Sequence, residues 1–146
     1  MKTIGGLLII LTSIIISHTY DKRQKERICA LKEISEFISF VKLHIEYFAL
    51  PLCDIYKKYN SKSRYADNLI NGYSIDILDK ETMDELSKAM TNLGKGYKEE
   101  QLKLLDYLNL VLTKKITENE ENYAQKTRVF RAISLFVGCC IVILLL

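Results

Sequence analysis

The last fifteen residues of the chain carry no charged side chain; residues 132–146 read A-I-S-L-F-V-G-C-C-I-V-I-L-L-L. As an α-helix this run reaches about 22 Å. If the helix begins a few residues earlier, with Arg131 snorkelling toward lipid headgroups, it approaches the ~17-residue lower limit for a membrane span. A buried core helix is the alternative. A second apolar run at the start of the chain favours the membrane span.

That second run covers residues 4–20 and reads I-G-G-L-L-I-I-L-T-S-I-I-I-S-H-T-Y. A cleaved signal peptide has a basic start and a small-residue cleavage site. Here the start carries only Lys2, no A-x-A pattern follows, and the charged stretch D-K-R-Q-K-E-R comes next. We therefore interpret residues 1–20 as an uncleaved transmembrane helix. The residues that we place in the membrane are Ile4, Leu11 and Tyr20 in the first run and Phe136, Gly138 and Leu146 in the second.

The charged side chains are segregated into the middle of the chain. Residues 21–131 hold 20 of the 21 basic and all 18 acidic residues, a net charge of +2 that is too balanced to indicate nucleic-acid binding. Lys and Arg gather beside both apolar runs, which by the positive-inside rule places the middle segment in the cytoplasm. The predicted organisation is a transmembrane helix over residues 1–20, a cytoplasmic helical domain over 21–131 and a second transmembrane helix over 132–146.

The middle segment begins with a helical pattern over residues 21–50. Its apolar positions recur at intervals of three and four, as expected for one side of an α-helix, at Leu31, Ile34, Ile38, Val41, Ile45 and Phe48. Further apolar residues widen this face, so the helix is expected to pack on more than one neighbour; they are Phe37, Phe40, Leu43 and Tyr47. Pro51 predicts a sharp corner, followed by a short helix over residues 52–59 and a polar loop over 60–63.

Capping signals divide the remainder. Gly72 is expected to close a short helix over residues 65–71. Asp79 predicts the N-cap of the next helix, and Gly94 and Gly96 predict its end. A long helix is expected from about Tyr97, apolar along one stripe and then polar as a stalk. The predicted fold class is all-α, an antiparallel helical bundle between the two transmembrane helices.

The residues that carry chemistry form no recognisable active site in the sequence. Cys29 and Cys53 lack a Cys-x-x-Cys spacing and are expected to be buried, and His44 falls on the polar side of the first helix. The sequence has no GxxxxGK[ST] loop and no Rossmann glycine pattern. We expect no enzymatic activity, no cofactor, no bound metal and no small-molecule substrate.

The layout nevertheless resembles the stage III sporulation protein AB family over nearly the whole chain. The resemblance rests on the opening Ile4-Gly5-Gly6, the sequence I-E-Y-F-A-L-P-L at 45–52, the Leu93-Gly94 turn followed by Gln101, and a final span containing Gly138. One departure is Tyr97, where the family usually has Asp. This predicts either a different turn chemistry or a shifted register at that position.

The resemblance implies a fold similar to the cytoplasmic domains of the type II secretion platform protein. It implies a non-enzymatic membrane platform in the channel complex between mother cell and forespore, located in the mother-cell membrane. The implied partners are a secretion-type ATPase and the other membrane subunits of the channel, with a homo-oligomer left open. The partner-binding candidates are Glu46, Tyr47, Pro51 and Leu52 at the corner and Gly94, Gly96 and Gln101 at the turn.

Each candidate also has a purely structural interpretation, with Pro51 as a corner, Gly94 and Gly96 as helix stops, and Glu46 as a solvated charge. Three other functions remain open from the sequence. They are a two-anchor membrane sensor or adaptor unrelated to sporulation, a small membrane enzyme using His44 and Cys53, and a secreted helical protein with a cleaved signal.

Overall fold

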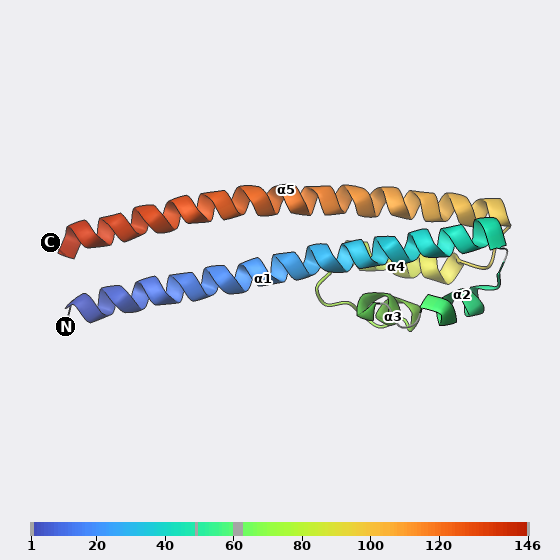
Figure 1. The fold of residues 1–146 in the computed structure, drawn as a ribbon, viewed down its shortest axis with the longest axis horizontal. Helices are drawn as coiled ribbons and strands as arrows, with labels where there is room; N and C mark the ends of the chain where they lie inside the picture. Colours follow the sequence, from blue (N-terminus) through green and yellow to red (C-terminus); the bar gives the residue numbers. More distant parts are fainter. Residues whose placement is uncertain (1, 49, 60–62, 146) are drawn as a thin grey trace. The chain divides into compact units, whose positions relative to one another are not determined.

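The computed structural model describes residues 2–48, 50–59 and 63–145; within these ranges, the side chains at 2–20, 130–131, 134–135 and 138–145 lie outside the description. The elements are α1 (Lys2–Leu43), a π-helical turn η1 (His44–Phe48), α2 (Leu52–Tyr59), α3 (Arg64–Ile70), α4 (Lys80–Asn92) and α5 (Lys98–Leu145) (Figure 1). No strand occurs in the described ranges. The predicted all-α fold class is confirmed.

The chain divides into two compact units. One contains residues 1–26 and 118–146, and the other contains 27–117. The first α-helix thus continues without a break from the predicted membrane run into the charged segment, as the absence of Pro and of interior Gly after Gly6 allows. The predicted domain boundaries, after residues 20 and 131, mark where the chain would leave the membrane. The division into compact units does not test them, so they stay predictions.

In the first unit, the N-terminal part of α1 and the C-terminal part of α5 run antiparallel, side by side (Figure 1). Tyr123 of α5 donates a hydrogen bond to the Asp21 carboxylate of α1 at 3.3 Å. The Lys25 ammonium lies 5.9 Å from the centroid of the Tyr123 ring, within the range of a cation–π contact. These contacts bring together two basic flanks that are a hundred residues apart in the sequence.

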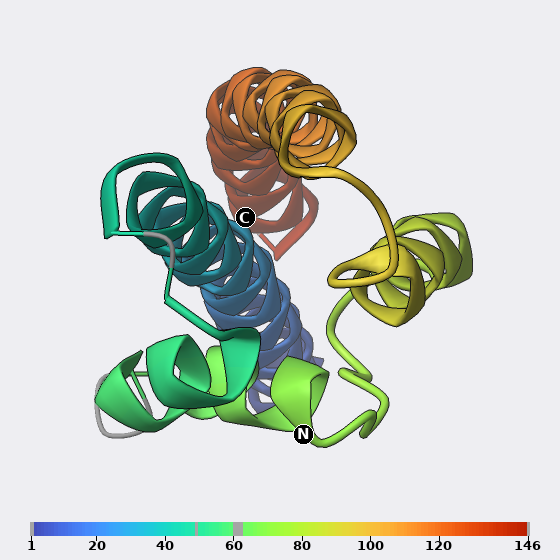
Figure 2. The same cartoon turned by 90° about the vertical axis from the view of Figure 1, so that its right-hand side faces the viewer.

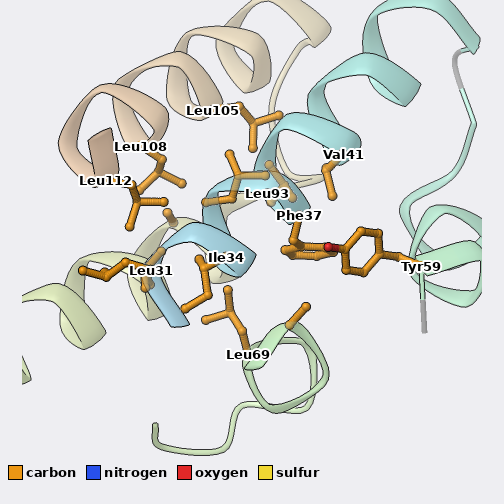
Figure 3. Packing of buried hydrophobic residues seen from close by; sticks show 14 of the residues in the cluster. Leu31, Ile34, Phe37, Val41, Tyr59, Leu69, Leu93, Leu105, Leu108 and Leu112 are labelled. Carbon is orange, nitrogen blue, oxygen red and sulfur yellow. The ribbon is translucent and has the colours of Figure 1, made fainter. Parts of the chain in front are cut away.

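The second unit is built around α1, with α5, α4 and the α2–α3 pair lying around it (Figure 2). The first helix therefore buries side chains in several directions, which confirms that it packs on more than one neighbour. Its buried residues meet the apolar stripe of α5, and Tyr59 and Leu69 contribute from α2 and α3 (Figure 3). The labelled members of this core are Leu31, Ile34, Phe37, Val41, Tyr59, Leu69, Leu93, Leu105, Leu108 and Leu112.

Local signals account for most element boundaries. The Asp79 carboxylate accepts a hydrogen bond from the Thr82 backbone N–H at 3.3 Å, so the predicted N-cap is confirmed. Gly72 follows α3 with a φ of 72°, and Gly94 follows α4 with a φ of 87°. Glycine is favoured at both positions because a β-carbon disfavours the left-handed region. Gly96, in contrast, has no positive φ.

Ser63 has a different role from the one predicted. The sequence placed it in a polar loop with residues 60–62, which lie outside the described residues. Instead, the Ser63 hydroxyl caps α3 by accepting from the Ala66 backbone N–H at 3.2 Å. It also donates to the Glu33 carboxylate of α1 at 2.5 Å. A serine followed by the start of a helix is a capping signal in its own right.

Several burial predictions were wrong. Phe48, Tyr47 and Leu43 are exposed instead of extending the apolar face. For Tyr47 and Phe48 the reason is the change from α-helix to the π-helical turn at His44, which rotates the following side chains away from the helical seam. Cys29 and Cys53 are exposed thiols rather than buried ones.

His44 is buried, although the sequence placed it on a polar side. Its ring lies 4.0 Å from the Phe40 ring and 5.3 Å from the Phe48 ring, centroid to centroid. Its Nδ1 donates to the Phe40 carbonyl at 2.9 Å. In a regular α-helix the Phe40 carbonyl would accept from the His44 backbone N–H. The hydrogen bond from the His44 ring to this carbonyl therefore occurs where the α-helix changes to the π-helical turn.

Candidate functional site

The Leu-Pro-Leu corner connects η1 to α2 and supplies one wall of the candidate site. The Pro51 carbonyl accepts hydrogen bonds from the backbone N–H groups of Asp54 at 3.0 Å and Ile55 at 3.2 Å. Pro51 therefore occupies the N-cap of α2, and the short helix predicted over residues 52–59 is confirmed. Ile55 anchors α2 in the core, whereas Pro51 itself is exposed and Leu52 is half-buried.

The turn between α4 and α5 supplies the opposite wall. Leu93 anchors this turn in the core, and the Lys95 N–H donates to the Asn92 carbonyl at 3.2 Å. A β-carbon placed on Gly94 would lie 2.7 Å from Leu52 Cδ1. The glycine thus serves two purposes, because it permits the positive φ and lets the backbone of the turn approach α2 closely. Two candidates 42 residues apart in the sequence are in contact.

The start of α5 carries the remaining turn residues. Tyr97 occupies the N-cap, and its carbonyl accepts from the Gln101 backbone N–H at 3.1 Å. Its own N–H donates to the Glu100 carboxylate at 3.3 Å. This is one half of a capping box; the tyrosine side chain cannot supply the other half, which is an acceptor for the Glu100 backbone N–H. The Gln101 side-chain amide donates to the Gly96 carbonyl at 2.8 Å and so holds the turn against the helix.

Lys98 joins the two walls. Its ammonium donates a hydrogen bond to the Glu46 backbone carbonyl at 2.6 Å, across 52 residues of sequence. The acceptor is a neutral carbonyl, so the positive charge of Lys98 is not neutralised by this contact. A neighbouring contact between α1 and α5 pairs the Lys42 ammonium with the Asp106 carboxylate at 2.5 Å.

An open cleft of about 460 Å³ lies between the corner and the turn, within the second compact unit. Four of its seven lining residues are candidates predicted from the sequence, namely Pro51, Leu52, Gly94 and Gln101. The other three, Ile45, Leu50 and Lys98, were not predicted as site residues. Their positions in the sequence could have indicated them. Ile45 and Leu50 belong to the I-E-Y-F-A-L-P-L sequence at 45–52, and Lys98 precedes the candidate Gln101 by about one helical turn.

The other partner-binding candidates lie outside the lining. Glu46 contributes its carbonyl to Lys98, while its side chain is exposed. Tyr47 is 72% exposed. Gly96 acts through its carbonyl, which accepts from Gln101. The structure therefore separates the candidates into four that line the cleft, two that hold it together and one exposed tyrosine.

The cleft has a mixed chemical character. Its floor and one wall are aliphatic, and Lys98 is the charged residue among the seven that line it. Ile45 is buried at the base, and Leu50 and Leu52 are half-buried, so part of their apolar surface faces the opening. Within the described residues, no three His, Cys, Asp or Glu side chains are grouped as a metal site would require.

The membrane candidates fall largely on residues whose side chains are not described. Ile4, Leu11, Tyr20 and Gly138 belong to that set, and Leu146 lies outside the described residues altogether. Phe136 is 72% exposed. Among the described side chains, none of the helices contains a stretch long and apolar enough for a bilayer crossing. The two transmembrane helices at 1–20 and 132–146 therefore stay predictions.

Comparison with known proteins identifies the family. The family described as stage III sporulation protein AB (spore_III_AB) matches residues 66–146. This match includes the Leu93-Gly94 turn, Gln101 and all of α5, and it begins after the Leu-Pro-Leu corner. No curated protein and no solved structure matches the chain. Because the match covers more than half of the 146 residues, the chain belongs to the stage III sporulation protein AB family, and its role is related to sporulation.

Proposed function

We propose that this member of the stage III sporulation protein AB family is a non-enzymatic membrane platform of the channel complex between mother cell and forespore. It docks a secretion-type ATPase at the mother-cell membrane through the cleft between the Leu-Pro-Leu corner and the Gly94 turn. Nucleotide hydrolysis belongs to the ATPase in this proposal. Residues 1–20 and 132–146 anchor the platform, and the domain between them faces the cytoplasm.

The proposal rests chiefly on one observation: the Leu-Pro-Leu corner and the Gly94 turn lie on opposite sides of one cleft. Pro51, Leu52, Gly94 and Gln101 come from separate parts of the sequence and line one open cleft. Buried neighbours hold each wall, with Ile55 behind the corner and Leu93 behind the turn. A docking surface that is rigid before binding loses little conformational entropy when the partner arrives.

The arrangement of basic residues supports the proposed orientation. Lys22, Arg23 and Lys25 follow the first apolar run, and Lys126 and Arg128 precede the second; all five are exposed. The Tyr123–Asp21 hydrogen bond brings these flanks to the same end of one compact unit. Two basic flanks on one side of the bilayer agree with a cytoplasmic domain anchored at both ends.

The proposal is tested by measuring binding between the full-length protein in lipid nanodiscs and the sporulation secretion-type ATPase of the same organism. Saturable binding is expected. A Leu50→Trp variant, which fills the cleft, is expected to weaken binding at least about tenfold, because the loss of a central interface contact costs about 2 kcal/mol or more. Leu110→Trp is the matched control, since Leu110 is 72% exposed on α5 and does not line the cleft.

Two outcomes would contradict the proposal. Absence of binding by the full-length protein in lipid would remove the ATPase as the partner and leave a membrane adaptor of another kind. Equal loss of binding in Leu50→Trp and Leu110→Trp would show that the cleft is not the docking surface. Thermal unfolding of each variant, compared with the unsubstituted protein, verifies that the substitutions leave the fold intact.

A further inference from the structure

We infer that the cleft binds a segment of its protein partner in which an aliphatic side chain lies beside a carboxylate. The aliphatic group enters between Ile45, Leu50 and Leu52, and the carboxylate pairs with Lys98. This inference rests on the proposed function and specifies the chemistry of the segment that docks.

The apolar part of the inference follows from the lining of the cleft. Ile45 closes the base, and Leu50 and Leu52 leave aliphatic surface facing the opening. Gly94 has no side chain, so Leu52 packs directly against the backbone of the opposite wall. The volume of about 460 Å³ is large enough for an aliphatic side chain. Burial of such a side chain is the expected source of affinity.

The charged part follows from Lys98. The residue is exposed at the rim, and its ammonium has three donors, of which one meets the Glu46 carbonyl at 2.6 Å. In the described part of the chain, no carboxylate forms an ion pair with Lys98. The hydrogen bond to Glu46 fixes where the ammonium lies without cancelling its charge. A carboxylate is therefore the complementary group.

Two nearby features bear on the electrostatics. The first turn of α5 begins at Lys98; the positive end of the helix raises the potential at this rim, and the carboxylates of Glu99 and Glu100 in the same turn lower it. The exposed carboxylate of Glu46 acts in the opposite direction, because it belongs to the residue whose carbonyl holds Lys98. Removal of that charge in Glu46→Gln is therefore expected to strengthen the binding of an acidic segment.

The first test uses the ATPase and the full-length protein in nanodiscs. In Lys98→Glu, the dissociation constant is expected to rise at least about tenfold, and the salt dependence of the association rate is expected to be lost or reversed, since a rim charge acts chiefly on that rate. Lys98→Arg should remain within about threefold of the unsubstituted protein, and Glu46→Gln should bind more tightly. Lys88→Glu, an exposed charge reversal on α4 away from the cleft, is the matched control.

A second test does not depend on the ATPase. The probes are 4-methylpentanoate, which carries an aliphatic group and a carboxylate, and its uncharged amide. Chemical shifts of leucine methyl groups in the full-length protein report their binding. The carboxylate is expected to bind at least about threefold more tightly than the amide, as for an exposed ion pair, and Lys98→Glu should remove that preference.

The outcomes separate this inference from the proposed function. If the ATPase binds the cleft but Lys98→Glu and Lys98→Arg bind it equally well, the platform function holds. The inference that the docking segment carries a carboxylate is then wrong. Equal binding of the two small probes, or shifts at methyl groups away from Leu50 and Leu52, would also overturn it. If the ATPase fails to bind while the carboxylate probe binds as expected, the chemistry of the cleft holds and the identity of the partner is wrong.

Discussion

The Asp79 carboxylate accepts a hydrogen bond from the Lys115 ammonium at 3.2 Å and thereby links the start of α4 to α5. The same carboxylate pairs with Arg27 of α1 and accepts from the Thr82 hydroxyl at 2.8 Å. Glu81 adds a second acceptor for Lys115 at 3.2 Å. One acidic side chain therefore caps a helix and connects three helices within the compact unit at 27–117.

The first prediction concerns the pH dependence of stability. Burial raises the pKa of Asp79, but hydrogen bonds from Thr82, Lys115 and backbone N–H groups outweigh it and hold the pKa well below its ordinary value of 3.8. A carboxyl whose pKa is lower in the folded state stabilises the protein above its ordinary pKa and loses that contribution as the pH falls toward the folded pKa. The free energy of unfolding should therefore fall on acidification below about pH 5.

The measurement is denaturant unfolding of the full-length protein in detergent between about pH 3 and pH 7, followed by circular dichroism. In Asp79→Asn, which has no titrating group at this position, the free energy of unfolding should change less over this range. An identical pH dependence in both proteins would mean that Asp79 is not the group responsible.

The second prediction separates the cap from the charge at Asp79. Asparagine caps helices about as well as aspartate, whereas alanine does not, so the difference between Asp79→Asn and Asp79→Ala isolates the cap. We expect Asp79→Ala to be less stable than Asp79→Asn by about 0.5–2 kcal/mol. Equal stabilities would show that the ion pairs alone account for this residue.

The third prediction concerns Gly94. Alanine at this position must adopt a φ of 87° and place its β-carbon 2.7 Å from Leu52 Cδ1. Gly72→Ala is the matched control, because its φ is 72° but no atom lies within 4 Å of the added carbon. Both variants should lose about 1–2 kcal/mol to the left-handed backbone, and Gly94→Ala should lose more.

Docking distinguishes the two glycine variants further. The added methyl group on Gly94 displaces Leu52, which lines the cleft, so Gly94→Ala should also weaken ATPase binding while Gly72→Ala leaves it unchanged. Binding in nanodiscs and thermal unfolding are measured on the same preparations. Unaltered binding in Gly94→Ala would argue that the shape of the cleft does not matter for docking.

The fourth prediction contrasts two phenylalanines of the same helical region. Phe37 is fully buried, and its ring packs tilted against that of Tyr59 with centroids 5.0 Å apart, whereas Phe48 is 60% exposed. Phe37→Ala should destabilise the protein by about 3–5 kcal/mol, and Phe48→Ala by less than about 1 kcal/mol. Chemical denaturation of both variants provides the comparison, and similar losses would contradict the burial assigned to Phe37.

The fifth prediction completes the capping box at the start of α5. Tyr97 is 83% exposed, and Glu100 already accepts from its backbone N–H. Tyr97→Ser supplies a hydroxyl that can accept from the first turn of α5, so it should be more stable than Tyr97→Ala by about 0.5–2 kcal/mol. Thermal unfolding of the two variants tests this, and equal midpoints would contradict it.

Several features of the fold followed from short-range patterns. The three-and-four spacing of apolar residues located the helices, and Asp79, Gly72 and Gly94 marked boundaries that the structure confirms. Such signals can be read from the sequence because a cap or a left-handed residue acts within one helical turn. The match to the family likewise depends on sequence alone.

The tertiary structure decided which of these local elements meet. The contact of Leu52 with Gly94 and that of Lys98 with the Glu46 carbonyl join residues about 40 and 50 positions apart, so no short-range pattern predicted the cleft that they form. The π-helical turn at His44 redirected Phe48 and Tyr47 toward solvent against their apolar character. Apolar periodicity establishes that a face is buried, whereas the helix against which it packs depends on how all the side chains fill one core.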